Sequence, residues 1–308
     1  MRINNKAGIM IDSLKKTEER ASYILLVVPA LVIYLFVMAF PVFFSIFLSF
    51  STYRSGHILD FSNHGFGGFT AYKEIFSDPY FYMALKNNIL IVLISVFGQI
   101  PLGFFLAYIL SRGLIKGTDF FQAMIYLPNV IAAIIIGILF KRFFLSSHSV
   151  LLEFQRRFDP EAMYIPSSGD LIPVLAVILW MYTGIYVLIF LANLQKIDVS
   201  VIEASKIDGA SEMQTLKYII LPALSGVIVT CAILAISGSL KSFDLIFVMT
   251  EGRPNHSTGV LSLYMFLKAF RGAPNYPVAN AISTVMVVIC FMLIGITRFV
   301  EKRFSSGD

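Results

Sequence analysis

Three polar side chains interrupt the end of a long apolar stretch. Ser237, Lys241 and Asp244 share one face of a predicted helix at positions i, i+4 and i+7. Ionisable groups in such stretches are functional candidates, so Lys241 and Asp244 could pair or bind hydroxyl groups of a solute. Helical rise from Pro222 puts Lys241 about 28 Å along this helix, near its far end. The alternative is that Lys241 simply extends its ammonium to a membrane surface.

An aromatic stripe precedes this region. Positions i, i+3, i+4 and i+7 of another predicted helix are Trp180, Thr183, Gly184 and Val187. Tyr182 and Tyr186 flank the stripe. An aromatic face beside the open space at a glycine would suit a sugar ring, which indicates Trp180, Gly184 and Tyr186 as solute contacts. The alternative is that Gly184 serves helix packing.

The segment between these two helices has the pattern of two short helices. Ser200 and Glu203 fit a capping box that opens the first, and Ser211 with Gln214 fits a second box. The pair Asp208-Gly209 between them is typical of a tight turn with positive φ. We therefore expect a helix–turn–helix on the membrane surface, for which a plain interfacial connector is the alternative.

The composition places these residues in a membrane protein. Hydrophobic residues make up 57% of the 308 residues, charged residues 14%, and the mean hydropathy is +0.78. A soluble domain carries about 25% charged residues, so this chain lacks the polar surface that water requires. A net charge of +5 without a dense basic tract argues against nucleic-acid binding.

Six charge-free runs reach the roughly 20 residues that a helix needs to cross a bilayer. They are Ala21–Tyr53, Asn87–Ser111, Phe120–Phe140, Leu171–Gln195, Tyr218–Leu240 and Gly272–Thr297. We therefore expect an all-α membrane protein with six transmembrane helices. The first run is too long for a cleavable signal peptide, and we expect its helix to start near Tyr23 and to kink or end around Pro41.

Basic residues indicate the orientation. Six crossings put both termini on one side, and lysine and arginine are about twice as dense in the segments of that side, as expected for the cytoplasm. A basic cluster precedes the first helix: Arg2, Lys6, Lys15, Lys16 and Arg20. We expect both termini to be cytoplasmic.

The loop between the fourth and fifth runs resembles a known signature. Glu203-Ala204-Ser205, then Gly209, then Ile219-x-Leu221-Pro222 is similar in residues and spacing to the EAA loop of the membrane subunits of binding-protein-dependent ABC importers. Ser205 departs from the family's third alanine but is also small. The residues around Asp208 resemble the sugar-importer branch, the maltose type.

The resemblance extends over roughly residues 20 to 300. Weaker matches lie in Gly68–Phe81, Phe121–Pro128, Phe190–Gln195 and Phe243–Phe270, and they follow the family's order. Arg253 stands where this branch usually has a second glycine before Pro254. We expect a cytoplasmic segment 1–20, a transmembrane domain 21–300 containing the EAA loop 196–222, and a cytoplasmic tail 301–308.

The resemblance implies a role for this loop in coupling to an ATPase. The residues concerned are Glu203, Ala204, Ser205, Asp208, Gly209, Leu221 and Pro222. Glu203 would contact the ATPase, or else only cap its helix. Gly209 would set the angle between the short helices, and small side chains would allow close approach.

The same resemblance implies several partners in a bacterial plasma membrane. These are a second, similar permease subunit rather than two copies of this chain, a cytoplasmic ABC ATPase dimer and an extracytoplasmic solute-binding protein. The chain has no G-x-x-x-x-G-K-[ST] phosphate loop, so we expect ATP and Mg²⁺ to be bound by the ATPase and this subunit to be non-catalytic.

Other functional classes find less support in the residues. A channel or secondary transporter working without ATP is the first alternative, but no internal repeat or mid-span charge indicates it. An intramembrane enzyme lacks H-E-x-x-H and G-x-S-x-G motifs, and the scattered histidines predict no metal site. Within the importer class, an amino acid, phosphate or polyamine remains an alternative to a sugar or a sugar-like solute.

Overall fold

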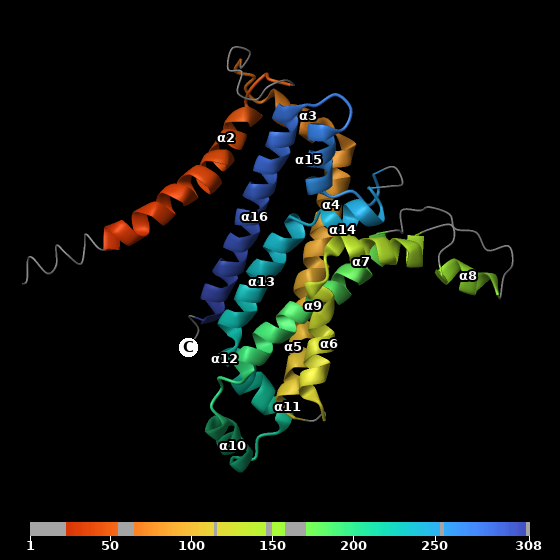
Figure 1. Ribbon diagram of the computed structural model, residues 1–308. Coiled ribbons are helices and arrows are strands. Elements are labelled where there is room, and N and C mark those ends of the chain that lie inside the picture. Colours follow the sequence, from red (N-terminus) through yellow and green to blue (C-terminus); the bar gives the residue numbers. More distant parts are fainter. Residues whose placement is uncertain are drawn as a thin grey trace, which may run out of the picture.

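The computed structural model describes residues 23–54, 65–113, 116–145, 150–157, 171–252 and 256–305. These residues form a bundle of long helices, and the predicted all-α class is confirmed (Figure 1). The segment 1–20 with its basic cluster, and Arg253, lie outside the described residues.

Five helices among the described residues are long and apolar enough to cross a membrane: Tyr23–Ser49, Pro79–Ser111, Leu171–Leu194, Ser225–Met249 and Tyr276–Arg303. The helical segments are α2 (Phe40–Ser49), α3 (Thr70–Ser77), α4 (Pro79–Ile94), α5 (Ile100–Ser111), α6 (Thr118–Val130), α7 (Ala133–Phe140), α8 (Val150–Arg156), α9 (Leu171–Leu194), α10 (Val199–Ile207), α11 (Glu212–Thr215), α12 (Leu221–Ala223), α13 (Ser225–Leu240), α14 (Asp244–Met249), α15 (Leu261–Phe270) and α16 (Tyr276–Ser305).

The third charge-free run is not one straight helix. α6 and α7 meet at 91° across Ile131 and Ala132, so the run Phe120–Phe140 makes the sixth predicted span only if this bent pair counts as one. The absence of charge sets the length of an apolar run but not its direction. Pro128 removes one hydrogen bond from the last turn of α6 and precedes the break.

Three π-helical turns lie just before prolines inside long helices. They are η1 (Leu35–Ala39) before Pro41, η3 (Ser95–Gln99) before Pro101 and η6 (Leu216–Ile220) before Pro222. In each, the residue before the proline donates its N–H to a carbonyl five residues back. The wider turn accommodates a ring that would clash with the i−4 carbonyl of an α-helix. The first helix therefore continues through Pro41, so of the two predicted alternatives, a kink or an end around Pro41, the end is wrong.

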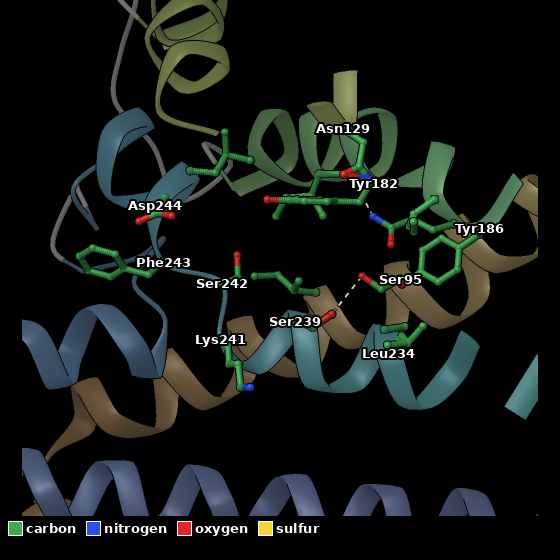
Figure 2. Close-up of a pocket in the computed structure, with 17 residues that line it drawn as sticks. Ser95, Asn129, Tyr182, Tyr186, Leu234, Ser239, Lys241, Ser242, Phe243 and Asp244 are labelled. Atoms are coloured by element: carbon green, nitrogen blue, oxygen red, sulfur yellow. Dashed lines mark hydrogen bonds between the residues drawn. The ribbon is translucent and has the colours of Figure 1, made fainter. Parts of the chain in front are cut away.

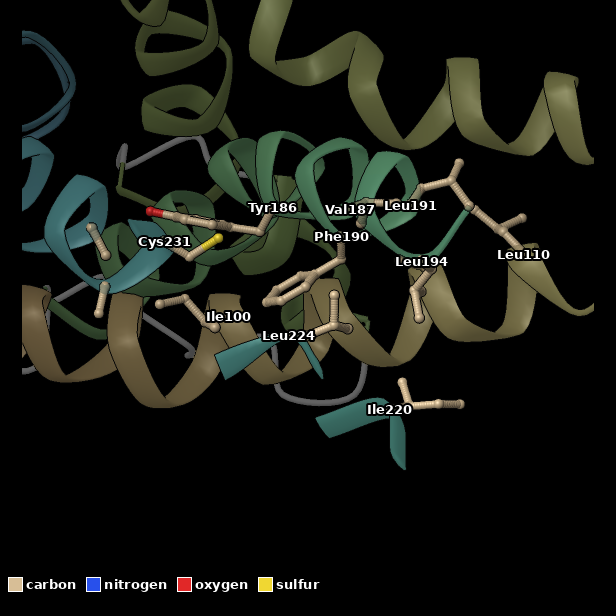
Figure 3. Packing of buried hydrophobic residues seen from close by; sticks show 13 residues of the cluster. Ile100, Leu110, Tyr186, Val187, Phe190, Leu191, Leu194, Ile220, Leu224 and Cys231 are labelled. Carbon is tan, nitrogen blue, oxygen red and sulfur yellow. The ribbon is translucent and has the colours of Figure 1, made fainter. Parts of the chain in front are cut away.

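The core forms where α9 packs against α5 and α6, and Figure 3 shows its buried side chains. Phe190 and Cys231 are fully buried at this place. Two glycines allow α9 to approach α5 and α6 closely. A Cβ on Gly103 would lie 2.7 Å from the Cβ of Tyr186, and one on Gly184 would lie 2.5 Å from the carbonyl oxygen of Ile125.

A polar contact fixes the end of the bundle that lies far from α10 and α11. Asp78 precedes α4 and accepts hydrogen bonds from the Tyr80 N–H (3.0 Å) and the Tyr264 hydroxyl, with Lys268 at 3.5 Å. Burial raises the pKa of Asp78, but these hydrogen bonds and the charge of Lys268 outweigh it, so the pKa lies below its ordinary value of 3.8. α15 is thereby held on the start of α4.

The first helix contacts its own chain mainly at one end. Ser45 donates to Asn280 of α16 at 2.6 Å, and Ser49 shares a hydrogen bond with Tyr72 at 2.8 Å. The earlier part lies away from the bundle, at the left of Figure 1, and the most apolar window of this helix has no buried residue. Its sides are therefore open to lipid or to another subunit.

Candidate functional site

The first short helix of the EAA loop begins two residues earlier than predicted. The N-cap of α10 is Asp198, whose carboxylate accepts the Ser200 N–H at 2.9 Å. The capping box assigned to Ser200 and Glu203 is therefore wrong. Aspartate is as good an N-cap as serine, so the earlier start costs nothing. The hydrogen bonds from Ser200 lower the pKa of Asp198.

This start leaves Glu203 without a capping role. Glu203 and Ala204 are both exposed on α10, and the Glu203 side chain makes no hydrogen bond or ion pair among the described residues. Ser205 is buried, donates to the Ile202 carbonyl at 2.8 Å and shares a hydrogen bond with Thr215 at 3.1 Å. Ser205 thus lies inside the loop, where it joins α10 to α11, and not on the surface expected to meet a partner.

The turn between the two short helices agrees with the sequence. Gly209 has φ = 80°, and the Ala210 N–H closes the end of α10 by donating to the Ser205 carbonyl at 3.0 Å. Asp208 is the exposed C-cap. The second capping box is confirmed: the Gln214 N–H donates to Ser211 at 3.3 Å, and the Gln214 side chain accepts the Ser211 N–H at 2.7 Å.

The loop is anchored at its base and open on its surface. Leu221 and Pro222 open α12, and the neighbouring Ile220 and Leu224 are buried in the core cluster. Large apolar side chains nevertheless face solvent: Val199, Val201, Ile207, Met213 and Tyr218. Five such side chains on one short loop are typical of a protein-contact surface. Figure 1 places this loop at one tip of the molecule.

A pocket of about 400 Å³ lies inside the bundle, a size in the range of small-molecule sites. It is enclosed by α4, η3, α9, α13 and α14, with one residue from the end of α6 (Figure 2). Non-helical backbone at Ser242 and Phe243 forms part of its wall. Irregular backbone at membrane depth is tolerated where it lines a cavity, which is the situation here.

Polar side chains of the pocket divide into two kinds. Gln99 donates to the Ile178 carbonyl at 2.7 Å, and Ser239 donates to Ser95 at 3.0 Å, so these bonds tie the wall together. By contrast, the side chains of Asn129 and Tyr182 make no hydrogen bond among the described residues. Their amide and hydroxyl groups are available to a bound molecule.

The structure brings some of the predicted solute contacts to this pocket. Tyr186 and Lys241 line it, as does Asp244, but no ion pair joins Lys241 to Asp244 in the described part of the chain. Ser237 lies on another face of α13, with its hydroxyl 3.9 Å from the Cys290 sulfur. Ser237 is absent from the pocket wall.

Trp180 and Gly184 also lie away from the pocket wall. Trp180 is half-exposed, and its ring packs edge-on against Phe140 at 5.4 Å. Gly184 contacts the backbone of α6, so the open space expected beside it is absent and the packing alternative is confirmed. Trp180 and Gly184 therefore lie on a different face of α9 from its pocket-lining residues, which are Ile178, Tyr182, Ile185 and Tyr186.

Sequence reasoning did not select five polar residues of the wall: Ser95, Gln99, Asn129, Ser239 and Ser242. A sequence signal exists for the first three. Ser95 and Gln99 interrupt an apolar run just before Pro101, and Asn129 directly follows Pro128. Polar side chains beside prolines in a membrane helix often mark discontinuities that line a cavity.

A bent third crossing, a central pocket with several polar side chains in its wall and an exposed helical loop at one end fit a membrane component of a transport system. Residues 99–306 match the family of binding-protein-dependent transport system inner membrane components. The chain belongs to this family.

Relatives match nearly the whole chain. It is 32% identical to the multiple sugar-binding transport system permease protein MsmF of Streptococcus mutans, over 91% of this chain and 93% of that protein. It is 31% identical to the lactose transport system permease protein LacF of Rhizobium radiobacter, over 87% and 90%. A chain from a bacterial ABC transporter involved in alginate import has the same fold, with a TM-score of 0.77 at 19% identity, covering 94% of this chain and 98% of that one.

Proposed function

We propose that this chain is the permease subunit of an ABC importer and forms half of the path for a sugar, an oligosaccharide or a sugar-like solute. The names of MsmF and LacF, which refer to sugars and lactose, support this solute class. The aromatic rings of Tyr182 and Tyr186 beside amide and hydroxyl groups suit a sugar's apolar faces and hydroxyls.

The proposal assigns the energy source to another chain. A cytoplasmic ATPase dimer binds ATP and Mg²⁺ and receives the EAA loop, while a second permease completes the path and an extracytoplasmic binding protein delivers solute. Both termini then lie in the cytoplasm of a bacterial inner membrane. Closure of the ATPase dimer moves the loop and opens the path alternately to each side.

The observation that carries this proposal is the exposed surface of the EAA loop. Its apolar side chains, from Val199 to Tyr218, are exposed in the part of the chain that the structure describes, and the Glu203 side chain has no partner there. Ala204 leaves room for close contact there, and Gly209 fixes the angle between α10 and α11. Asp208, Leu221 and Pro222 belong to the same proposed coupling unit.

The test uses the complete transporter in liposomes, with solute uptake and ATP hydrolysis measured together. Glu203→Lys and Gly209→Val should leave the permease in the membrane but separate ATP hydrolysis from uptake. Glu153→Lys, a matched charge reversal at an exposed site of α8, should leave both unchanged. Unchanged uptake and unchanged ATPase binding in Glu203→Lys, or uptake without any ATP, would overturn the proposal.

A further inference from the structure

An ion pair joins the EAA loop to a helix that does not adjoin it in the sequence. Arg112, the C-cap of α5, donates to the Glu212 carboxylate at the start of α11 at a distance of 2.5 Å. The Arg112 side chain is 19% exposed and that of Glu212 is 72% exposed. The arginine is therefore held within the protein, whereas the glutamate comes from the exposed loop.

Arg112 is the last member of a row of stacked side chains along α5. Its guanidinium lies 5.5 Å from the Tyr108 ring centre, and Tyr108 stacks on Phe104 at 6.2 Å. Phe104 in turn packs edge-on against the fully buried Phe190 of α9 at 5.4 Å. A guanidinium fixed by an aromatic face has few other rotamers, so Glu212 meets a rigid partner.

The other end of α5 reaches the central pocket. One continuous helix carries Arg112 at its end and Gln99 on the pocket wall, about 20 Å away by helical rise. Between them, Gly103 brings the backbone of α5 against Tyr186, which also lines the pocket. A shift of α5 along its axis would therefore move the pocket wall.

The EAA loop thus has two connections to the pocket. The first is covalent and runs through Pro222 into α13, which carries Ser239. The second runs from Glu212 to Arg112 and along α5 to Gln99. We propose that Arg112 is a positioning residue through which movement of the EAA loop is transmitted to the pocket by way of α5. This inference rests on the proposed function and adds a transmission path to it.

A merely stabilising ion pair would behave differently. Glu212 is mostly exposed, and exposed pairs contribute little to stability, about 0–1 kcal/mol. Loss of the pair should therefore leave folding nearly unchanged. A transmission role requires instead that uptake and ATP hydrolysis lose their fixed ratio.

The experiment measures solute molecules imported per ATP hydrolysed by the complete transporter in liposomes. Arg112→Gln and Glu212→Gln should each lower this ratio by about fivefold or more, the lower end of usual coupling between sites, with an unchanged melting temperature. The exchanged pair, Arg112→Glu with Glu212→Arg, should recover most of the ratio. Arg298→Gln, which breaks the exposed Arg298–Glu301 pair of 3.0 Å on α16, is the matched control and should not change it.

The outcomes separate the inference from the proposed function. An unchanged ratio in Glu212→Gln, whose exposed side chain makes misfolding improbable, overturns the inference. Equal losses in the single variants and in the exchanged pair also overturn it, because the charge pairing would then be irrelevant. Absence of ATP-driven uptake in the unaltered transporter refutes the proposed function itself.

Discussion

Gly184 could either leave space for a solute or pack against another helix, and its missing Cβ serves packing. Its neighbours on α6 approach so closely that any side chain would meet the Ile125 carbonyl oxygen at 2.5 Å and the Tyr126 Cα at 3.0 Å. Backbone atoms cannot rotate away as side chains do. The glycine therefore sets the distance between α9 and α6, and with it the position of Asn129 on the pocket wall.

We expect Gly184→Ala to destabilise the permease by about 1–3 kcal/mol, because α9 and α6 must separate to admit the methyl group. Thermal unfolding of the purified protein in detergent measures the loss. Gly226→Ala is the matched control, since a Cβ there meets nothing within 4 Å and alanine favours the helix. Equal melting temperatures for the two variants would contradict the packing role of Gly184.

At the scale of elements, the sequence predicted which segments are helical better than how they bend. The fourth run was predicted as Leu171–Gln195 and is observed as Leu171–Leu194, because an uninterrupted apolar run between polar ends defines a crossing. The break between α6 and α7 was not predicted, because an apolar run carries no information about direction. The pocket depends on this bend and on the unwound backbone before α14, so only part of its wall was foreseeable.

π-helical turns precede three prolines, and one of these prolines allows a prediction about a whole helix. Pro101→Ala removes the cause of η3, so the turn can relax to an α-helix and rotate Ser95 and Gln99 by about 100° relative to α5. The melting temperature should rise, because a proline inside a helix costs up to about 3 kcal/mol. Solute-stimulated ATP hydrolysis should fall about tenfold, because the rotation displaces Gln99 and Ser95, whose bonds to Ile178 and Ser239 hold the pocket wall, and a tenfold change corresponds to about one hydrogen bond.

Pro41→Ala separates the effect on the melting temperature from the effect on solute-stimulated ATP hydrolysis. η1 has the same arrangement before Pro41 but lies far from the pocket in the first helix. This variant should also raise the melting temperature while leaving solute stimulation unchanged. A pocket effect of equal size in both variants would show that η3 has no special part in forming the site.

At the scale of the whole molecule, the two ends of the bundle differ in what they expose. One end carries α10, whose Ile207 is 86% exposed, and the opposite end carries α3, which follows shortly after Phe66, a residue that is 84% exposed (Figure 1). The proposed orientation puts Ile207 in the cytoplasm under an ATPase and Phe66 outside. Cysteines at these two equally exposed positions therefore test topology and partner contact together.

We expect a membrane-impermeant maleimide to label Phe66→Cys in intact cells and Ile207→Cys only in inverted membranes, with Cys231 and Cys290 replaced by alanine. Binding of the ATPase should then protect Ile207→Cys, because the apolar surface of the EAA loop becomes buried. Phe66→Cys should stay reactive under the same conditions, which controls for a general loss of access. Labelling of both positions from the same side would refute the proposed topology. Full reactivity of Ile207→Cys in the assembled transporter would mean that the loop's apolar surface has some other purpose than holding the ATPase.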